Sequence, residues 1–327
     1  MKARNYWKPL AALTGAVAAA AGAAAINRRV ARPSGSLPNL IGGDAGWYDW
    51  RGYQIAWTRR GSGPAVLLVH AVHAAGWSYE WRRVVDPLAA AGYTVWTVDL
   101  LGFGRSERPD LEYSARLYID LLRDFIREAV AAPTALVGSS LSGAFAVATA
   151  AGFAPVTHLL LVTAPGITRL VRPATPVNDA TRAALDAPVA GQALFNAVVS
   201  RPSMAAFLRQ TYYDDALVTP ELLDAYQATA HQPGARHAVA AFVGQALNVY
   251  VGGALGRVRQ PILLTWGREA KEVPLAELDE YRAIRPDAAV RTWERCGSLP
   301  HDEKAEEWCR AVVEFLGAGR LAGTGVV

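Results

Sequence analysis

The stretch VGSSLSG, residues 137–143, continues an apolar run from Thr134 that is typical of a buried strand. Gly138 interrupts the apolar run, and small residues continue from Ser142 into an alanine-rich segment that favours a helix. The pattern predicts a strand, a very tight turn and a helix, with Ser140 at the tip of the turn. Such a turn can present a serine as a nucleophile, but the hydroxyl does little at neutral pH without a base beside it.

Segments that resemble strands and helices alternate on both sides of this turn. The runs LLVH, ALVG, LLLV and ILLT are continuously apolar, as expected of strands buried on both faces of a sheet. We expect strands at residues 47–50, 53–57, 65–70, 93–98, 134–137, 158–162, 261–266 and 288–293, and helices at residues 79–91, 113–131, 141–151, 274–284 and 302–316. This alternation predicts βαβ units and a mostly parallel sheet flanked by helices, an α/β fold.

Residues 167–258 break this alternation, because they contain helical patterns without clear strands. Thr219 and Pro220, for example, supply an N-cap and a first-turn proline for the segment PELLDAYQATA. We therefore expect a helical insertion over one end of the sheet. Ligand sites of open α/β sheets lie at the carboxyl ends of the strands, so an insertion there would form a lid over the site.

The composition indicates one large folded domain, or a core domain with an insertion. The 327 residues are 52% apolar and 19% charged, which argues against extensive disorder. The net charge of +4 is small and its basic residues are dispersed, so we expect no nucleic-acid binding. Cys296 and Cys309 lack metal-ligand spacing and are either free thiols or one bridge. We expect no metal and no cofactor.

Residues 9–26 form an uncharged segment of 18 residues with basic residues on both sides. This length just reaches a membrane span, although alanine predominates over large aliphatic residues. Three interpretations compete: a signal anchor, a cleaved signal peptide that would make the protein secreted, and an alanine-rich surface helix. We favour a single-pass anchor. Because basic residues flank both ends equally, the sequence does not set the side of the membrane on which the domain lies.

These features divide the chain into an apolar anchor or signal at residues 1–31, a linker at 32–46 rich in Pro, Gly and Ser, a folded domain at 47–317 and a flexible tail at 318–327. The insertion at about 167–258 lies inside the folded domain. The sequence holds no signal for the oligomeric state.

Three stretches together resemble one known family. They are HAVH at residues 70–73, DLLGFGRSERP at 99–109 and VGSSLSG at 137–143, each directly after an expected strand. They resemble the α/β-hydrolase superfamily, in the branch with a helical lid between the sixth and seventh core strands. The resemblance extends over residues 47–316 and implies that fold, with VGSSLSG as the turn that carries the nucleophile.

The resemblance assigns Ser140 to the nucleophile position. Residues two before and two after a nucleophile in this strained turn must be small, and Gly138 and Ser142 satisfy this, although the family usually has glycine at the second position. The backbone N–H of Leu141, at a helix N-terminus, would form half of an oxyanion hole. The resemblance assigns the other half to Val72.

The same resemblance places the rest of a catalytic triad in two later loops, at 261–275 and 294–303. The position of the acid is Ala270, with Val273 and Pro274 confirming the register, and the position of the histidine is Ser298. Both positions are therefore vacant. Loss of triad members costs on the order of 10⁴–10⁶ in kcat. Bacterial members of the superfamily with similar SSLS turns and LPHEE tails indicate a subgroup with few triad residues.

Other residues could replace the missing base and acid. His73 lies in the expected oxyanion loop and is a candidate base, although a histidine of the pocket wall is the simpler interpretation. Glu269 and Glu272 neighbour the acid position. The remaining histidines are expected to be structural or solvated: His158 in a strand, His231 and His237 in the insertion, and His301 at the start of the last helix.

Two functions follow from these residues. The first is a membrane-tethered binding protein that holds a small hydrophobic or acyl ligand in the pocket with little or no turnover. The alternative is an active carboxylester-type serine hydrolase that uses an unconventional base such as His73, with a small ester-like substrate.

Overall fold

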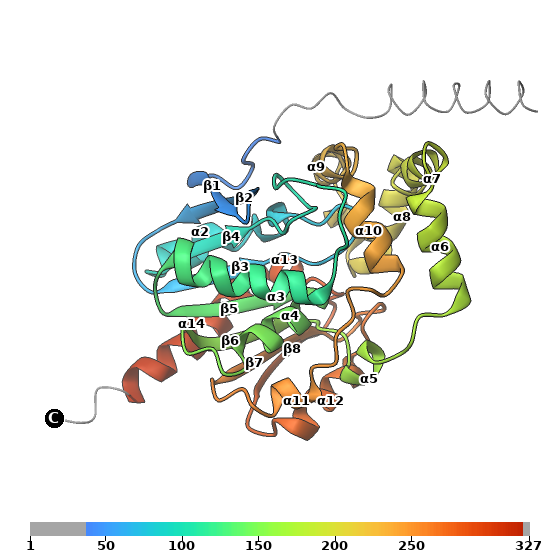
Figure 1. Ribbon diagram of the computed structural model, residues 1–327. Helices are drawn as coiled ribbons and strands as arrows, with labels where there is room; N and C mark the ends of the chain where they lie inside the picture. Colours follow the sequence, from blue (N-terminus) through green and yellow to red (C-terminus); the bar gives the residue numbers. More distant parts are fainter. Residues whose placement is uncertain (1–36, 323–327) are drawn as a thin grey trace, which may run out of the picture.

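The computed structural model describes residues 37–322 of the chain. Its centre is an eight-stranded sheet with the order β1-β2-β4-β3-β5-β6-β7-β8 (Figure 1). The strands are β1 (Asp44–Trp50), β2 (Tyr53–Arg60), β3 (Ala65–Val69), β4 (Thr94–Val98), β5 (Thr134–Ser139), β6 (Val156–Val162), β7 (Ile262–Gly267) and β8 (Ala289–Trp293). β2 pairs antiparallel with β1 and with β4, and all other pairs are parallel. The expected α/β sheet is confirmed.

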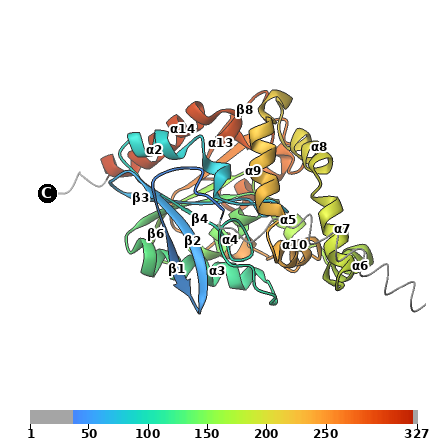
Figure 2. The ribbon, with the colours of Figure 1, turned by 90° about the horizontal axis from the view of Figure 1, so that it is seen from above.

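The central strands are buried on both faces, because alternate side chains enter two separate hydrophobic clusters. In β3, Leu67 and Val69 belong to one cluster, whereas Val66 and Leu68 belong to the other. The helices α3 (Ala115–Asp124) and α4 (Leu141–Ala150) cover the first face, and α2 (Val85–Ala90) and α14 (Ala305–Ala322) cover the second (Figure 2). Burial on both faces explains why these strands are continuously apolar in the sequence.

The helix expected over residues 79–91 is divided into two. A 3₁₀ turn, η1 (Ser78–Trp81), precedes α2, which begins only at Val85. Proline lacks an N–H group and its ring clashes with the carbonyl four residues earlier, so Pro87 is tolerated only in the first turn of a helix. Pro87 is the third residue of α2, and the helix therefore cannot extend back through Arg83.

Two other expected helices also differ in detail. The helix expected over 113–131 begins after Ser114, whose hydroxyl accepts a hydrogen bond from the N–H of Leu117. It ends in a π-helical turn, η2 (Phe125–Val130). The last helix is preceded by a short one, α13 (Pro300–Glu303). The segment expected as a helix at 274–284 is the 3₁₀ turn η4 (Leu275–Glu277) followed by α12 (Leu278–Ile284).

The chain between β6 and β7 forms a helical insertion at one end of the sheet (Figures 1 and 2). Its elements are α5 (Ile167–Leu170), α6 (Pro176–Asp186), α7 (Ala190–Val198), α8 (Arg201–Thr211), η3 (Asp215–Leu217), α9 (Pro220–Ala230), α10 (Ala235–Val243) and α11 (Gly252–Leu255). Thr219 caps α9 with its side chain, and Pro220 is the first residue of that helix.

Cys296 and Cys309 are both buried and unbridged. Within residues 37–322, no helix combines the length and the apolar character that a membrane span requires. The expected membrane segment at 9–26 lies outside the described residues, and so do the second half of the tail (323–327) and the first part of the linker (32–36).

Candidate functional site

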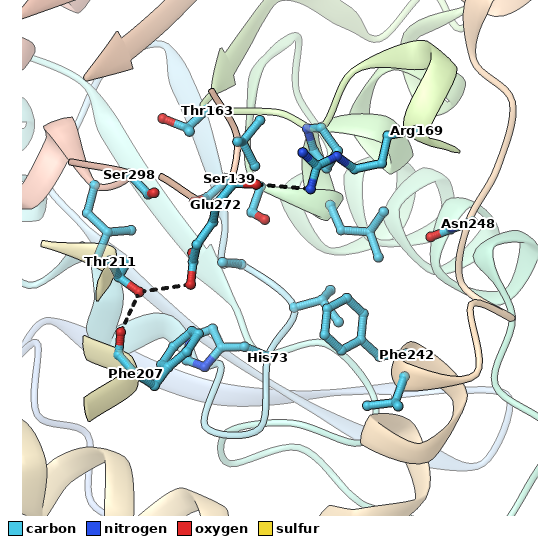
Figure 3. A pocket seen from close by; sticks show the side chains of 18 of the residues that line it. His73, Ser139, Thr163, Arg169, Phe207, Thr211, Phe242, Asn248, Glu272 and Ser298 are labelled. Atoms are coloured by element: carbon cyan, nitrogen blue, oxygen red, sulfur yellow. Dashed lines mark hydrogen bonds between the residues drawn. The ribbon is translucent and has the colours of Figure 1, made fainter. Parts of the chain in front are cut away.

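A cavity of about 660 Å³ lies where the loops after the parallel strands meet the helical insertion. Val72, Ser140 and Ser298 line it from the sheet side, and Phe207 and Phe242 line it from the insertion. Figure 3 shows His73, Thr211, Glu272 and Ser298 among the side chains around it. The cavity is thus at the carboxyl ends of the strands, where open α/β sheets bind their ligands.

Ser140 occupies the turn between β5 and α4 with φ 50° and ψ −131°, a backbone conformation that is strained for a residue other than glycine. The chain around it is tightly packed. A Cβ atom on Gly138 would lie 2.6 Å from the carbonyl oxygen of Ser142, and one on Gly143 would lie 2.8 Å from the Cβ atom of Ala164. The sequence pattern did not distinguish Gly143, although it closes the stretch VGSSLSG.

Ser142, where the family usually has glycine, fastens the turn to the neighbouring loop. Its side chain is fully buried, and the hydroxyl donates a hydrogen bond of 2.6 Å to the carbonyl oxygen of His70. His70 immediately precedes the loop that carries Val72. The extra hydroxyl therefore joins the two segments that would form an oxyanion hole.

The two expected oxyanion donors, Val72 and Leu141, both line the cavity. Leu141 is the first residue of α4, so its N–H group has no partner within that helix. In the part of the chain that the structure describes, neither the Val72 nor the Leu141 amide has a hydrogen-bond partner. Both amides are therefore able to donate to an oxygen atom in the cavity.

The hydroxyl of Ser140 has no hydrogen-bond partner among residues 37–322. Ala270, at the expected acid position, is 5% exposed. Its neighbour Glu269 is bound to the next loop, because its carboxylate accepts a 2.9 Å hydrogen bond from the N–H of Cys296. Glu269 is thus part of the framework that joins the loops after β7 and β8.

Ser298, at the expected histidine position, lines the cavity with a buried hydroxyl. No described residue forms a hydrogen bond with that hydroxyl. The loop that carries it is held by Glu303, whose carboxylate accepts hydrogen bonds from the N–H groups of Gly297 (2.6 Å) and Tyr213 (2.8 Å). The backbone N–H of Ser298 itself bonds the carbonyl oxygen of Thr211 at 2.8 Å.

His73 is the one histidine among the described residues that lines the cavity. Its ring lies between those of Phe207 and Tyr226, with centroid distances of 5.7 and 5.6 Å. Burial lowers the pKa of His73 to about 4 and so favours the neutral ring. Its Nδ1 accepts a hydrogen bond from the N–H of Ala75 at 3.3 Å, which places the ring proton on Nε2. In this arrangement neither nitrogen offers a free lone pair to Ser140.

Glu80 is a buried carboxylate of the cavity wall that the sequence did not indicate. Its Oε2 accepts a 2.7 Å hydrogen bond from the N–H of Ala71, and its Oε1 lies 3.1 Å from Nε2 of His301. Burial by itself would raise the pKa of Glu80, but contacts with His301, Ser139 and Ala71 lower it to about 2. Glu80 therefore stays ionised, and it joins the loop that carries Val72 to the end of β5 at Ser139.

His301 is fully buried against Trp81, with the ring centroids 4.3 Å apart. It contacts Glu80 from outside the cavity, since it is not one of the residues that line the cavity. The expected packing role of His301 agrees with this position. His158 lies within β6, beside Phe315, rather than near the cavity.

A second carboxyl group, that of Glu272, lines the cavity near the acid position. It accepts a 3.2 Å hydrogen bond from the Thr211 hydroxyl, and burial raises its pKa (Figure 3). Arg169 donates to the backbone carbonyl of Glu272 at 2.9 Å and forms an ion pair with Glu277. The charge of Arg169 is thus already compensated.

Metal-binding clusters of His, Cys, Asp and Glu are absent from the described residues.

The chain belongs to the alpha/beta hydrolase family, whose sequence model matches residues 66–312. It is 28% identical over 280 residues to a 2-hydroxy-6-oxo-6-phenylhexa-2,4-dienoate hydrolase of Burkholderia cepacia, a match that covers 82% of this chain and 92% of that protein. A 2-hydroxy-6-oxononadienedioate/2-hydroxy-6-oxononatrienedioate hydrolase of Comamonas testosteroni is 26% identical over 276 residues. That match covers 82% of this chain and 92% of that protein.

Solved structures show the same fold. A serine hydrolase involved in carbazole degradation has a TM-score of 0.71 and 22% identity. The match covers 85% of this chain and 100% of that protein. A bacterial membrane phospholipase A has a TM-score of 0.68 and 22% identity. The match covers 95% of this chain and 96% of that protein. The resemblance inferred from the sequence motifs is confirmed.

Proposed function

We propose that this member of the alpha/beta hydrolase family binds a small hydrophobic or acyl molecule in its cavity with little or no turnover, and that residues 9–26 tether it to a membrane. One observation carries the first part: among the described residues, no base forms a hydrogen bond with the Ser140 hydroxyl. The resemblance assigns Ala270 and Ser298 to the positions of the acid and the histidine, and the His73 ring packs at a tilt between two aromatic rings with its Nδ1 in use.

The walls of the cavity suit an apolar ligand of small to moderate size. Leu170, Phe207, Phe242 and Val243 line it, and its volume of about 660 Å³ is typical of small-molecule sites. The helical insertion supplies these four residues and so acts, in this proposal, as the lid over the bound molecule.

A second candidate function is an active carboxylester hydrolase, and the backbone of the turn favours it. Ser140 has the strained conformation of a presented nucleophile, and the amides of Val72 and Leu141 are free to stabilise an oxyanion. The relatives of this chain reported above are named as hydrolases. For His73 to act as the base, its hydrogen bond with Ala75 would have to break.

A fluorophosphonate probe and a short-chain aryl ester separate the two functions. The purified full-length protein and its Ser140→Ala variant are treated side by side, and ester turnover and covalent labelling are measured. We expect no turnover that depends on Ser140, because the hydroxyl lacks a base. Turnover that disappears in Ser140→Ala would reject the binding function in favour of the hydrolase.

The tether is tested by fractionation of cells that produce the full chain. We expect the protein in the membrane fraction after a high-salt wash, because the apolar segment and not surface charge would hold it. Replacing Leu13 and Val17 by arginine should release it, since arginine in a membrane span costs roughly 2.5–3.5 kcal/mol per residue. A protein that is soluble before either replacement would contradict the tether.

A further inference from the structure

We propose that helix α7 of the insertion docks on a lipid bilayer through its exposed apolar side. This inference rests on the proposed function in one respect, the tether at residues 9–26. It adds a second contact with the membrane, made by the insertion itself. The residues of α7 do not line the cavity, so the surface is separate from the site described above.

The exposed residues of α7 are all apolar. Leu194 is 40% and Val198 54% exposed, and Ala190 and Ala197 are exposed as well. Residues that are three or four positions apart lie on one side of a helix, so these four form a single stripe. Phe195 points away from the stripe and is fully buried. We call the stripe the outer face.

Charged groups are missing from the sequence around the outer face. Residues 187–200 contain no Asp, Glu, Lys, Arg or His, and the charged residues on either side, Asp186 and Arg201, both form ion pairs. The neighbouring helix α6, which lies with α7 at the outer edge of the insertion, adds Val177, 73% exposed (Figures 1 and 2). Exposed apolar side chains that gather in this way mark an interaction surface.

The residue types of the outer face favour lipid over a protein partner. Protein interfaces derive most of their affinity from Trp, Tyr and Arg side chains, and the exposed residues of α7 include none of these. Leucine and valine, in contrast, move favourably from water into a bilayer. The outer face therefore has the chemistry of a surface that inserts among lipids.

The chain before β1 keeps this face within reach of a membrane. The described residues begin at Leu37, and residues 27–36 join them to the uncharged segment that ends at residue 26. Fully extended, this connection spans at most roughly 36 Å. A weak contact gains from such a connection, because a linked site binds at an effective concentration on the order of mM. The outer face thus needs little affinity of its own.

Docking also has a consequence for the ligand. The insertion contributes Leu170, Arg172 and Asn178 to the cavity wall, and Arg172 is also solvent-exposed. The cavity therefore meets the protein surface on the same insertion that carries the outer face. We expect a docked insertion to bring this rim close to the bilayer, where a hydrophobic ligand is concentrated.

Quenching of a fluorophore by spin-labelled lipids tests the docking. The full-length protein is reconstituted into neutral phosphatidylcholine vesicles with a fluorophore on Ala197→Cys or, as a control, on Ser62→Cys in the exposed turn between β2 and β3. Cys296 and Cys309 are buried, so labelling should be restricted to the introduced cysteine. We expect strong quenching at position 197 and little at position 62, because a docked helix lies about 5–10 Å into the headgroup–acyl boundary.

Leu194→Asp together with Val198→Asp should reduce the quenching at position 197 to the level at position 62, because aspartate strongly disfavours insertion among lipids. The protein should still float with the vesicles through its tether. Ile284→Asp is the matched control and should leave the quenching unchanged, since Ile284 is 36% exposed on α12, outside the insertion.

Each other outcome overturns the docking or the tether separately. Equal quenching at positions 197 and 62 in protein that floats would overturn the docking and leave the tether standing. Energy transfer between labels on two copies, without quenching by lipid, would assign the outer face to a second copy. A label that is shielded from water but not quenched, and that becomes exposed in Leu13→Arg with Val17→Arg, would assign it to residues 9–26. Quenching at position 197 in protein that still floats with those two replacements would retain the docking and reject the tether.

Discussion

The turn between β5 and α4 and the loops after β7 and β8 face the same cavity, but they differ in what holds them. In the turn, close packing holds the shape: a Cβ atom on Gly138 would meet backbone atoms, one on Gly143 would meet the Cβ atom of Ala164, and Ser140 lies at φ 50°. In the two loops, side chains hold the shape: Glu269 and Glu303 bind backbone N–H groups of the loop after β8.

On the proposed function, this difference explains how the turn can keep the geometry of a nucleophile while the two loops carry alanine and serine at the positions assigned to the acid and the histidine. A shape held by backbone contacts rejects most substitutions, since no side-chain movement relieves a clash with main-chain atoms. A loop held by hydrogen bonds from neighbouring positions tolerates replacement of a residue that is not part of those bonds. The side chains at Ala270 and Ser298 take no part in them.

The largest effect is expected from restoring the triad with Ala270→Asp together with Ser298→His. We expect Ser140-dependent hydrolysis of an aryl ester to rise at least ~100-fold, because complete triads contribute on the order of 10⁴–10⁶. Adding Ser140→Ala to the double variant is the control and should abolish the gain. A well-folded but inactive double variant would show that the loops have moved as well as changed residues.

Next in size, Gly138→Ala tests the rigidity of the turn. The new Cβ atom would meet the carbonyl oxygen of Ser142 at 2.6 Å and the backbone of Gly143 at 2.8 Å. We expect the free energy of unfolding, measured in urea, to fall by about 3 kcal/mol. Gly317→Ala is a matched control within α14, where nothing lies within 4 Å, and it should stabilise the protein by up to ~1 kcal/mol. If Gly138→Ala and Gly317→Ala changed the free energy of unfolding equally, the turn would not be held by close packing.

Glu80→Gln should change how stability depends on pH. The pKa of Glu80 is lowered from 4.5 to about 2, so its ionised form stabilises the fold above pH 4.5 and this contribution disappears as the pH falls toward 2. The contribution is roughly 3 kcal/mol at most. We expect the unfolding free energy of the wild type to fall more steeply than that of the variant between pH 4.5 and 2. Parallel curves would show that Glu80 does not stabilise the oxyanion loop.

The smallest effect is expected from Ser142→Ala, which removes the 2.6 Å hydrogen bond to the carbonyl oxygen of His70. Because that carbonyl is buried, its loss of a partner should cost about 1–2 kcal/mol in urea unfolding. Ser62→Ala, at an exposed position where the hydroxyl has no hydrogen bond to the described residues, should cost nothing measurable. An unchanged stability in Ser142→Ala would mean that the turn and the oxyanion loop are held together by packing alone.

Much of the fold could be predicted because its signals are local. Continuous apolar runs marked the buried parallel strands, and the order of these strands with helices between them indicated the α/β fold. The break before Pro87 was not predicted, although its cause is also local. The π-helical turn that follows α3 has no comparable signal in the sequence, and the aromatic contacts of Phe125 with Tyr48 and Trp96 do not explain it.

The place of the candidate residues in the fold was predictable where a motif fixes the register of a loop. The sequence placed Ser140 at the turn before α4 and Ser298 in the loop after β8, and both line the cavity. Their catalytic assignment, and that of Ala270, stays a prediction. Glu80 was not predicted, because nothing in the sequence SYEWRR distinguishes a buried, ionised glutamate from an exposed one. Its role depends on His301 and Ala71, which are far from it in the chain or belong to another loop.

By itself, the sequence determined the sheet and the strained turn, and it assigned Ala270 and Ser298 to the positions of the acid and the histidine, because each of these depends on neighbours along the chain. The tertiary structure alone decided what surrounds these positions. It packed the His73 ring between Phe207 and Tyr226, buried the hydroxyl of Ser298 without a partner among the described residues and placed Glu80 beside the loop that carries Val72. Burial and charge at a site depend on side chains that only folding brings together.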